Sequence, residues 1–445
     1  MTYTRNLNLV SSSMVKMRGL AKQLLSSLSV SRFTDKTQER LKKFLIVFLL
    51  VSGLHVFADV TVTNVSVKPR WPWNGLVDIT YSIECDEVDE ENQPKDVYVY
   101  FSGHDNVRNK KIAMRTLTGA GASAPVKHGG PYTVTWNAYE DETGINSSAF
   151  EVKVQALTGL ADYLVVNLKE WTIWFSKEEP NWNNDTCRTT ELWLRRIMPG
   201  TFKMGSPKNE LGRIEDEIQH EVTLTQIFYI GVFEFTQKQW NLVMGNNPSS
   251  YKGDTRPVEC ITYNMIRGNS SDAGMGWPKY GHTVDSNSFC GILRNKTGLT
   301  FDLPTEAQWE YACRAGTTTA ININKDLTSN SSCSNLNQAG RYNCNTSDGK
   351  GGYSQHTKVG SYLPNAWKLY DMHGNVYEWC LDWYGAYPSS AVTDPIGPET
   401  GSRRIDRGGS WDGWAPYIRS ACRGDGYPAT GCYYGFRIAY FPFEK

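Results

Sequence analysis

Hydrophobic and polar residues alternate with a period of two between residues 59 and about 160. This alternation places successive side chains on opposite faces of a strand, and Gly, Pro, Asn and acidic residues separate the runs. Several short strands at this spacing predict an all-β sandwich. The runs are VTVTNVSV (60–67), LVDITYSI (76–83), DVYVYF (96–101), YTVTW (132–136) and FEVKVQA (150–156).

Beyond a predicted linker at residues 161–189, the pattern changes over residues 190–445. Gly, Asn and Trp are frequent, and the hydrophobic runs are short and separated by long irregular stretches. TQKQWNLVMG (236–245) and TEAQWEYACRAG (305–316) each predict a helix that begins after a threonine cap and ends at a glycine. The second region is therefore expected to be an α+β domain whose long loops carry its function.

An apolar run near the N-terminus predicts export. Lys42 and Lys43 precede the apolar residues 44–57, and Val-Phe-Ala at 56–58 has the small-residue pattern of a cleavage site. The run is shorter than the ~20 residues that span a bilayer. Residues 1–58 are therefore expected to be an N-terminal extension and signal peptide cleaved after Ala58. The mature protein would be secreted, periplasmic or on the cell surface, with membrane contact only through this segment if it were uncleaved.

Charge and cysteine content narrow the possible partners. The 46 Lys and Arg residues equal the 46 Asp and Glu residues, so the basic excess expected of a nucleic-acid-binding protein is absent. Export makes the ten cysteines candidates for disulfides, with Cys333 and Cys344 a plausible pair and Cys85 either bridging domains or free. The cysteines show no Cys-x-x-Cys spacing, which disfavours a zinc site.

Several motifs in the second region occur in a recognisable order. They are GTFKMGS, IGVFEFTQKQWNLVMGNNPS, RPVECITYN, LPTEAQWEYACRAGT, LYDMHGNVYEWCLDWYG, RGGSW and GFRI. In this order they resemble the formylglycine-generating-enzyme, or sulfatase-modifying-factor, family across roughly residues 190–442. The resemblance implies a modified C-type-lectin fold for this region. The 59–160 region resembles immunoglobulin-like or fibronectin-like modules in its layout.

The family resemblance also implies a copper chemistry that this chain does not match. Authentic members use two cysteines to bind Cu(I) and oxidise a sulfatase cysteine, within Cys-x-Pro-x-Arg, to formylglycine. Thiolates are the soft ligands that select Cu(I). The corresponding positions here are Gly413 and Ile418, so copper is not expected and no catalytic residue is assigned. Cys422 and Cys432 are the alternative ligands if the chain is an oxidase after all.

The YDMHGNVYEW motif resembles a calcium site of the family. The resemblance assigns carboxylates to Asp371 and Glu378 and main-chain carbonyls to Gly374 and Val376, an oxygen set that suits Ca²⁺. The structural alternative is a Gly-Asn turn that leads into a buried strand, with Glu378 in an ion pair. A second family calcium site, near Asn335, Leu336 and Asp348, is left open because its loop departs from the pattern.

The C-terminal segment is the predicted ligand-binding region. Tyr, Trp, Gly and Asp residues on a rigid frame are typical of binding loops, because aromatic rings supply contact area at low entropic cost. The predicted binding residues are Ser410, Trp411, Trp414, Tyr417, Arg419, Arg423, Tyr427, Tyr433 and Tyr434. Arg419 and Arg423 could instead pair with carboxylates and hold loops.

Three functions follow from these observations. The first is a non-oxidase that binds a protein or glycan ligand through this segment, with bound calcium. The second is a sulfatase-maturing oxidase. The third is a surface binding protein similar to the variable proteins of diversity-generating retroelements.

Overall fold

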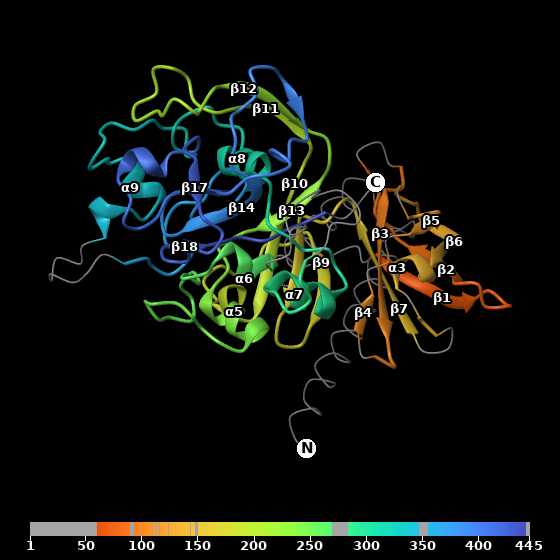
Figure 1. Ribbon diagram of the computed structural model, residues 1–445. Helices are drawn as coiled ribbons and strands as arrows, with labels where there is room; N and C mark the ends of the chain where they lie inside the picture. The colour runs from red at the N-terminus through yellow and green to blue at the C-terminus, as the bar shows by residue number, and fades with distance from the viewer. Residues whose placement is uncertain are drawn as a thin grey trace. The chain divides into compact units, whose positions relative to one another are not determined.

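The computed structural model describes residues 60–441 except 90–92, 109, 113, 115, 123, 143, 147–149, 269–283 and 347–354 (Figure 1). Among the described residues, Val60, Thr61 and Glu84–Lys95 form one unit, and Val62–Ile83 with residues 96–441 form the other. The predicted signal peptide and its cleavage site lie outside the described residues, as does Asp348. Within the described ranges, no helix is long and apolar enough to cross a bilayer.

The strands predicted between residues 59 and 160 are present in two sheets. One sheet has the order β1 (Thr61–Pro69), β2 (Leu76–Glu84), β6 (Gly129–Asn137), β5 (Leu117–Gly119), and the other β4 (Lys110–Ile112), β3 (Val97–Asp105), β7 (Phe150–Thr158). A short helix, α3 (Ala138–Asp141), follows β6. Buried Ile79 and Trp136 of the first sheet share a core with Ile112 of the second. All five predicted runs are therefore strands, whereas the immunoglobulin-like topology stays a prediction.

A five-stranded sheet lies at the centre of the following region. Its order is β19 (Ala439–Tyr440), β13 (Phe228–Gly231), β10 (Glu191–Ile197), β8 (Tyr163–Asn167), β9 (Thr172–Ser176), and every neighbouring pair is antiparallel. Strands β8 and β9, with the short helix α4 (Thr186–Thr189), come from residues 161–189, which were expected to be a linker. Because β8 pairs with β10, these residues extend the sheet.

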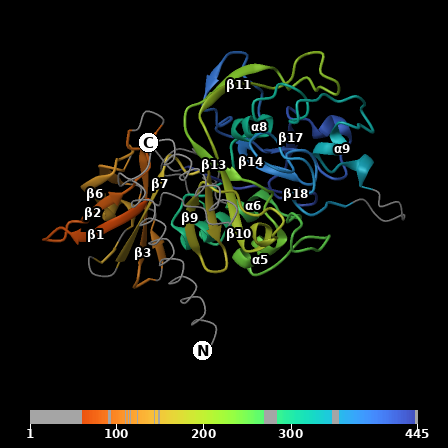
Figure 2. The same ribbon diagram turned by 180° about the vertical axis from the view of Figure 1, so that it is seen from behind.

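The helices that follow α4 are short, and all of them except the last begin at a side-chain cap (Figures 1 and 2). They are α5 (Gln237–Met244), α6 (Tyr263–Arg267), α7 (Phe289–Thr297), α8 (Glu306–Arg314) and α9 (Leu336–Ala339). Both predicted helices are confirmed: Thr236 and Thr305 form capping boxes, and Gly245 ends α5 at a φ of 74°. Helix α8 ends one residue earlier than predicted, because Ala315 adopts the left-handed conformation.

Two further sheets carry the loops of the C-terminal half. One is β11 (Gly200–Met204), β12 (His220–Leu224), β15 (Val392–Thr393), and the other is β17 (Gly424–Gly426), β16 (Arg404–Arg407), β14 (Tyr377–Trp383), β18 (Tyr434–Gly435). Two 3₁₀ turns are η1 (Asn343–Asn345) and η2 (Ala415–Ile418). The described chain is thus mostly β, with few and short helices.

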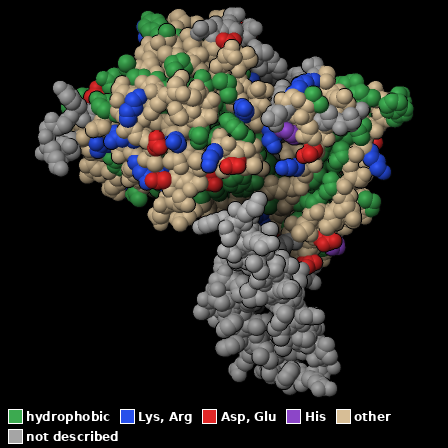
Figure 3. Space-filling view, turned by 90° about the horizontal axis from the view of Figure 1, so that it is seen from below, with side chains coloured by type: hydrophobic (Ala, Val, Ile, Leu, Met, Phe, Trp, Pro, Cys, Tyr) green, Lys and Arg blue, Asp and Glu red, His purple; other side chains and the backbone are tan. Residues whose placement is uncertain are grey.

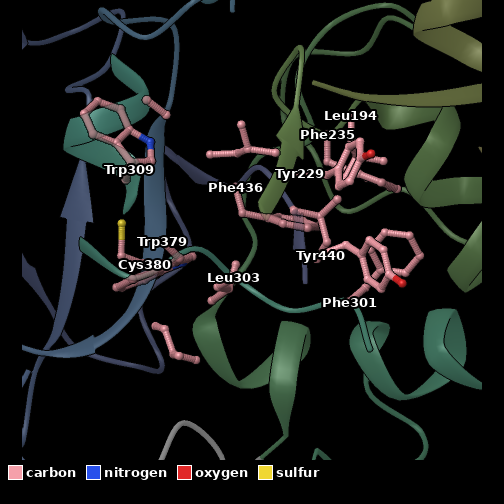
Figure 4. Packing of buried hydrophobic residues seen from close by; sticks show 14 of the residues in the cluster. Leu194, Tyr229, Phe235, Phe301, Leu303, Trp309, Trp379, Cys380, Phe436 and Tyr440 are labelled. Carbon is pink, nitrogen blue, oxygen red and sulfur yellow. The ribbon is translucent and has the colours of Figure 1, made fainter. Parts of the chain in front are cut away.

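Large aromatic side chains fill the core of this region (Figure 4). Phe235 stacks on Phe436 at 5.3 Å between ring centroids, and Trp309 of α8 and Trp379 of β14 are fully buried. Such rings bury a large apolar area each, which stabilises a domain that has little regular structure. The core therefore accounts for much of the Trp and Phe content, and the remaining exposed aromatics need a separate explanation.

Exposed acidic and basic side chains are interspersed on the face drawn in Figure 3. The more unusual charge arrangement lies inside the protein, where Arg267, Arg404, Arg407, Arg419 and Arg437 are among the largest fully buried side chains. A guanidinium has to be paired when it is removed from water. The partners of these arginines consequently define how the C-terminal segment is held.

Candidate functional site

The two positions that the family resemblance assigns to copper lie next to each other. A Cβ atom at Gly413 would be 3.1 Å from Ile418 Cδ1. Ile418 is fully buried in a small cluster with Ile321 and Tyr342, and its carbonyl lies 2.6 Å from His373 Nδ1. These positions therefore contribute an isoleucine side chain and bare backbone to the site, and neither supplies a thiol.

The nearby Cys422 thiol is also poorly suited to bind a metal. It is buried, and burial raises its pKa to about 12, so the thiolate form is strongly disfavoured. Cys432 is exposed on the loop that precedes β18. Across the described residues, no group of three or more His, Cys, Asp or Glu side chains is arranged to hold a metal ion.

Two of the predicted binding residues are arginines that form buried ion pairs. Arg419 contacts Glu217 at 2.5 Å and Glu210 at 2.6 Å, and the side chains of Arg419 and Glu217 are 0% exposed. Arg423 pairs with both oxygens of Glu306, at 2.7 and 2.8 Å. Burial opposes the charge on Arg419, but the hydrogen bonds to Glu217 hold its pKa above the ordinary value. Both guanidiniums form ion pairs within the protein, although Arg423 Nη1 is buried without a hydrogen-bond partner.

A third buried arginine holds the strand from which the segment begins. Arg407 at the end of β16 pairs with Glu310 of α8, and it donates to the carbonyls of Ser420, Ala421 and Cys422. One guanidinium thus connects β16, α8 and the chain that follows η2. Buried groups of this kind are costly to leave unpaired, so this network fixes the backbone course of the segment.

Four other predicted binding residues point outward. The exposed fractions are 48% for Trp414, 49% for Tyr417, 54% for Tyr427 and 42% for Tyr433. Trp414 caps η2 and Tyr417 lies within it, and the Tyr417 amide donates to the Trp414 carbonyl at 2.9 Å. Large aromatic rings exposed along one segment are the usual composition of a binding surface. We call residues 408–434 the aromatic segment.

The last three predicted binding residues lie below this surface. Ser410 and Trp411 are only 2% and 3% exposed, and Tyr434 stacks on Trp379 at 4.4 Å. Trp411 packs against Tyr433 at 4.9 Å, so its ring supports an exposed one. These residues belong to the floor of the aromatic segment and can reach a ligand only through the residues above them.

The glycines of the RGGSW motif allow the chain to approach itself. Gly408 and Gly409 have φ values of 85° and 75°, and a Cβ atom at Gly409 would lie 2.6 Å from the Tyr417 carbonyl oxygen. Only glycine tolerates this conformation and this contact. In the structure the backbone that approaches Gly409 is that of η2.

The predicted calcium residues form a buried acidic cluster. Asp371 Oδ2 accepts a hydrogen bond from the Gly360 amide at 2.5 Å, and Asp371 Oδ1 is buried without a hydrogen-bond partner. Both oxygens of Glu378 are bound, one by Arg437 alone and the other by Arg437 and Trp309. Arg437 of the GFRI motif anchors the sheet through this pair and through the Gly231 carbonyl.

Sequence reasoning missed a third carboxylate in this cluster. Glu234 accepts hydrogen bonds from Asn375 Nδ2 and the Val376 amide, and burial together with the charges of Asp371 and Glu378 raises its pKa well above the ordinary range. It follows β13, more than a hundred residues before the motif, so spacing alone could not reveal it. Asp371 Oδ1 is the one oxygen of Asp371 and Glu378 left without a partner, and the three carboxylates of the described cluster are not arranged to hold a metal ion.

The expected bridge between Cys333 and Cys344 is not formed in this structure. Cys333 is buried in the cluster around Ile321, and its Sγ accepts from both the amide and the hydroxyl of Thr328 at 3.5 Å. Cys344 lies in η1 and is partly exposed. The Ser- and Asn-rich loop between them is closed by the Tyr342 hydroxyl, which contacts the Cys333 backbone.

Fold and site together define a mostly β domain with an exposed aromatic segment on a frame of buried ion pairs. Comparison with known proteins shows that the chain belongs to the family of sulfatase-modifying factor enzyme 1-like (FGE-sulfatase) domains, whose model matches residues 181–440. This match confirms the family resemblance drawn from the seven motifs.

Several relatives carry quite different names. The chain is 32% identical over 214 residues to the chaperone protein LppX of Paenibacillus barcinonensis, which covers 43% of this chain and 71% of LppX. It is 36% identical over 151 residues to the formylglycine-generating enzyme of Streptomyces coelicolor, covering 31% of this chain and 46% of the enzyme. It is 40% identical over 310 residues to the serine/threonine-protein kinase pkn1 of Chlamydia pneumoniae, covering 67% of this chain and 44% of the kinase. The chain thus spans less than half the length of the last two.

Among solved structures, the chain is similar to Treponema denticola variable protein 1 and to PvdO from Pseudomonas aeruginosa. The first has a TM-score of 0.45 and 27% identity, covering 57% of this chain and 96% of that one. The second has a TM-score of 0.44 and 26% identity, covering 56% of this chain and 94% of that one.

Proposed function

We propose that this chain is a non-oxidase member of the family that binds another protein through the aromatic segment. The observation that carries the proposal is the exposure of Trp414, Tyr417, Tyr427 and Tyr433 on a backbone held by buried ion pairs. A fixed backbone reduces the conformational entropy that binding would otherwise cost. Exposed aromatic rings on such a backbone can bury a large area against a partner.

A protein partner is favoured over a glycan by the relatives. LppX, which this chain covers over 71% of its length, is named a chaperone, and a chaperone acts on other proteins. The two arginines of the segment are not available to bind the hydroxyl groups of a sugar, because Arg419 and Arg423 are engaged in ion pairs. A glycan ligand remains the alternative that the binding experiment separates.

The proposal that the chain is not an oxidase rests on the side chains at the copper positions. Gly413 and Ile418 supply no thiol, and Cys422 is a buried thiol with a pKa of about 12. The 36% identity to a formylglycine-generating enzyme favours the opposite function, so the two have to be separated directly.

The oxidase function is tested with the chain loaded with Cu(I) under oxygen and incubated with a Cys-x-Pro-x-Arg peptide. Mass spectrometry reports conversion of the peptide cysteine to formylglycine, and circular dichroism shows that the protein is folded. We expect the peptide to stay unchanged. Formylglycine formation would overturn the proposal and identify Cys422 or Cys432 as the copper ligand to substitute next.

The binding function is tested by selecting peptides from a displayed library against the full chain, with a glycan array in parallel. We expect selected peptides to bind the wild type and to lose at least about tenfold in affinity to a Trp414→Ala/Tyr417→Ala double variant. Trp71→Ala is the matched control, because Trp71 is 89% exposed and lies outside the segment. Equal peptide affinity for the wild type and the double variant, or binding of glycans without any peptide, would contradict a protein partner at this surface.

We also propose that the protein is exported with cleavage after Ala58, as its apolar N-terminal run predicts. Mass spectrometry of the mature N-terminus tests this. A mature chain beginning at Asp59 is expected, and a chain that retains residues 42–58 would contradict it.

A further inference from the structure

A pocket of about 440 Å³ lies apart from the exposed aromatics, at the N-terminal end of α8. Glu306 and Ala307 of α8, Asp382 and Trp383 of β14 and the loop 385–398 line it. Its volume lies within the range of small-molecule sites, about 300–1,000 Å³. Neither the copper positions nor the acidic cluster around Asp371 contributes to its walls. The pocket is therefore a site that the proposed function does not use.

The walls are apolar and the floor is polar. Prolines 388, 395 and 398, together with Val392 and Ile396, line the loop side. His220 of β12 also lines the pocket, and its ring packs on Tyr387 at 4.7 Å between centroids. An apolar wall with a few converging polar groups is the usual construction of a small-ligand site.

One of the two floor carboxylates is already neutralised. Glu306 forms a bidentate pair with Arg423, whose side chain is 2% exposed, and it accepts a hydrogen bond from the Tyr387 hydroxyl at 2.9 Å. Because Arg423 neutralises its charge, Glu306 is not expected to form an ion pair with a ligand. Arg423 was predicted to bind a ligand as part of the aromatic segment, and in the structure it lines this pocket instead.

The other carboxylate has no cationic partner. Asp382 Oδ2 accepts one hydrogen bond from the Glu306 amide at 2.8 Å, and no Lys, Arg or His of the described residues forms an ion pair with it. Asp382 is 4% exposed, and burial together with the charge on Glu306 raises its pKa to about 7. Glu306, Arg423 and ionised Asp382 leave the pocket with one uncompensated negative charge.

We propose that this pocket binds a primary ammonium group on an alkyl stem, with Asp382 as the counter-ion and the proline-rich loop around the stem. An ammonium ion supplies the positive charge and the hydrogen-bond donors that Asp382 lacks. The apolar wall accommodates methylene groups, which gain by leaving water. A lysine side chain of a partner peptide and a free alkylamine share this chemistry.

The test is isothermal titration calorimetry on the full chain at pH 8, where Asp382 is ionised. The probes are n-butylamine, N-acetyl-lysine amide and, as the neutral control, n-butanol. We expect saturable binding of at least one amine and none of the alcohol. Binding of n-butylamine alone identifies a free amine as the ligand, and binding of N-acetyl-lysine amide identifies a peptide side chain. The proposal is overturned if n-butanol binds as well as the amines, or if neither amine saturates.

Two variants locate the binding. Asp382→Asn should lower amine affinity about tenfold or more, because it removes the charge but keeps an oxygen for the Glu306 amide. Ile396→Trp should abolish binding by filling the pocket from the loop, and it covers the case in which Asp382→Asn fails to fold.

Glu399→Gln is the matched control, since Glu399 is exposed on the same loop and does not line the pocket. Equal affinity in Asp382→Asn, Ile396→Trp and the wild type would place the amine elsewhere and overturn the assignment. Loss of peptide binding at Trp414 would not affect this result, so the two proposals fail independently.

Discussion

Tyr417 and Arg419 are two residues apart in the aromatic segment, yet their surroundings are opposite. The Tyr417 side chain is about half exposed and follows the outward turn of η2. The Arg419 side chain is fully buried and is held by two glutamates that lie about two hundred residues earlier in the sequence. Both had been assigned to ligand binding from the sequence, and the structure supports such a role only for the tyrosine.

The contrast shows that one segment can contain both buried, ion-paired residues and exposed aromatic residues. Replacing a buried arginine affects partners on several elements, because Arg407 alone connects β16, α8 and residues 420–422. Replacing an exposed ring affects only what binds there. Substitutions at Trp414 or Tyr417 are therefore expected to leave the frame beneath them undisturbed.

The largest expected effect comes from breaking that frame. Arg419→Met should lower the free energy of unfolding by about 3–5 kcal/mol, because it leaves Glu217 and Glu210 buried without a counter-charge. Urea denaturation followed by circular dichroism measures the change. Arg403→Met is the control: Arg403 pairs with Asp425 at the surface, and such pairs contribute about 0–1 kcal/mol. Equal losses in the two variants would show that burial of the Arg419 pair has no special role.

Asp382 should make stability depend on pH. Its pKa is about 7 in the folded protein, raised by burial and then by the Glu306 charge, and lies near 3.8 when unfolded. Because the folded-state pKa is the higher one, the contribution to stability is full below about pH 4 and declines up to about pH 7. A pKa difference of this size changes the free energy of unfolding by at most about 4 kcal/mol. The charged and titratable groups around the Asp382 carboxylate are Glu306, Arg423, Arg404, His220 and Tyr387.

The measurement compares urea unfolding of the wild type and Asp382→Asn from pH 4.5 to pH 8. Other buried carboxylates, such as Asp406 with a pKa of about 7, titrate in both proteins and cancel in the difference. We expect the wild type to lose stability relative to the variant as pH rises. A constant difference across this range would mean that Asp382 is ionised throughout and has a cationic neighbour in solution.

Calcium should have a smaller effect, because the carboxylates of Asp371, Glu234 and Glu378 are not arranged to hold a metal ion among the described residues and would have to move to bind one. A cation that binds only the folded state stabilises it by about 2.7 kcal/mol at one hundred times its dissociation constant. We therefore expect EDTA to lower the melting temperature and CaCl₂ to restore it. Asp371→Asn should abolish this response, and Asp394→Asn, at an exposed-loop carboxylate, should retain it. An identical melting temperature with EDTA and with CaCl₂ would show that this cluster binds no calcium.

Local patterns in the sequence predicted the local structure well. The alternation with a period of two predicted five strands. Thr236 and Thr305 predicted the starts of α5 and α8, because a helix cap depends only on residues within one turn. The ordered motifs located the family domain for a similar reason: each motif is contiguous. The strands β8 and β9 were missed because an apolar run such as YLVV, read alone, does not reveal its partner β10.

Contacts between distant residues could not be predicted in the same way. Nothing near Arg419 in the sequence indicates Glu217, and nothing near Glu378 indicates Glu234. The exposed and buried members of the aromatic segment also look alike in composition, since Trp411 is buried and Trp414 is not. Only the fold separates them, because burial depends on which elements cover a residue.

The smallest effect on stability is expected where the effect on binding should be largest. Trp414→Ala removes a side chain that is 48% exposed, so the free energy of unfolding should change by no more than about 0.5 kcal/mol. Trp411→Ala, three residues earlier, removes a ring that is 3% exposed and should cost about 3–5 kcal/mol. Urea denaturation of the two variants side by side makes the comparison. If Trp414→Ala were as destabilising as Trp411→Ala, the Trp414 ring would be part of the frame, and its exposure could no longer be explained by a partner.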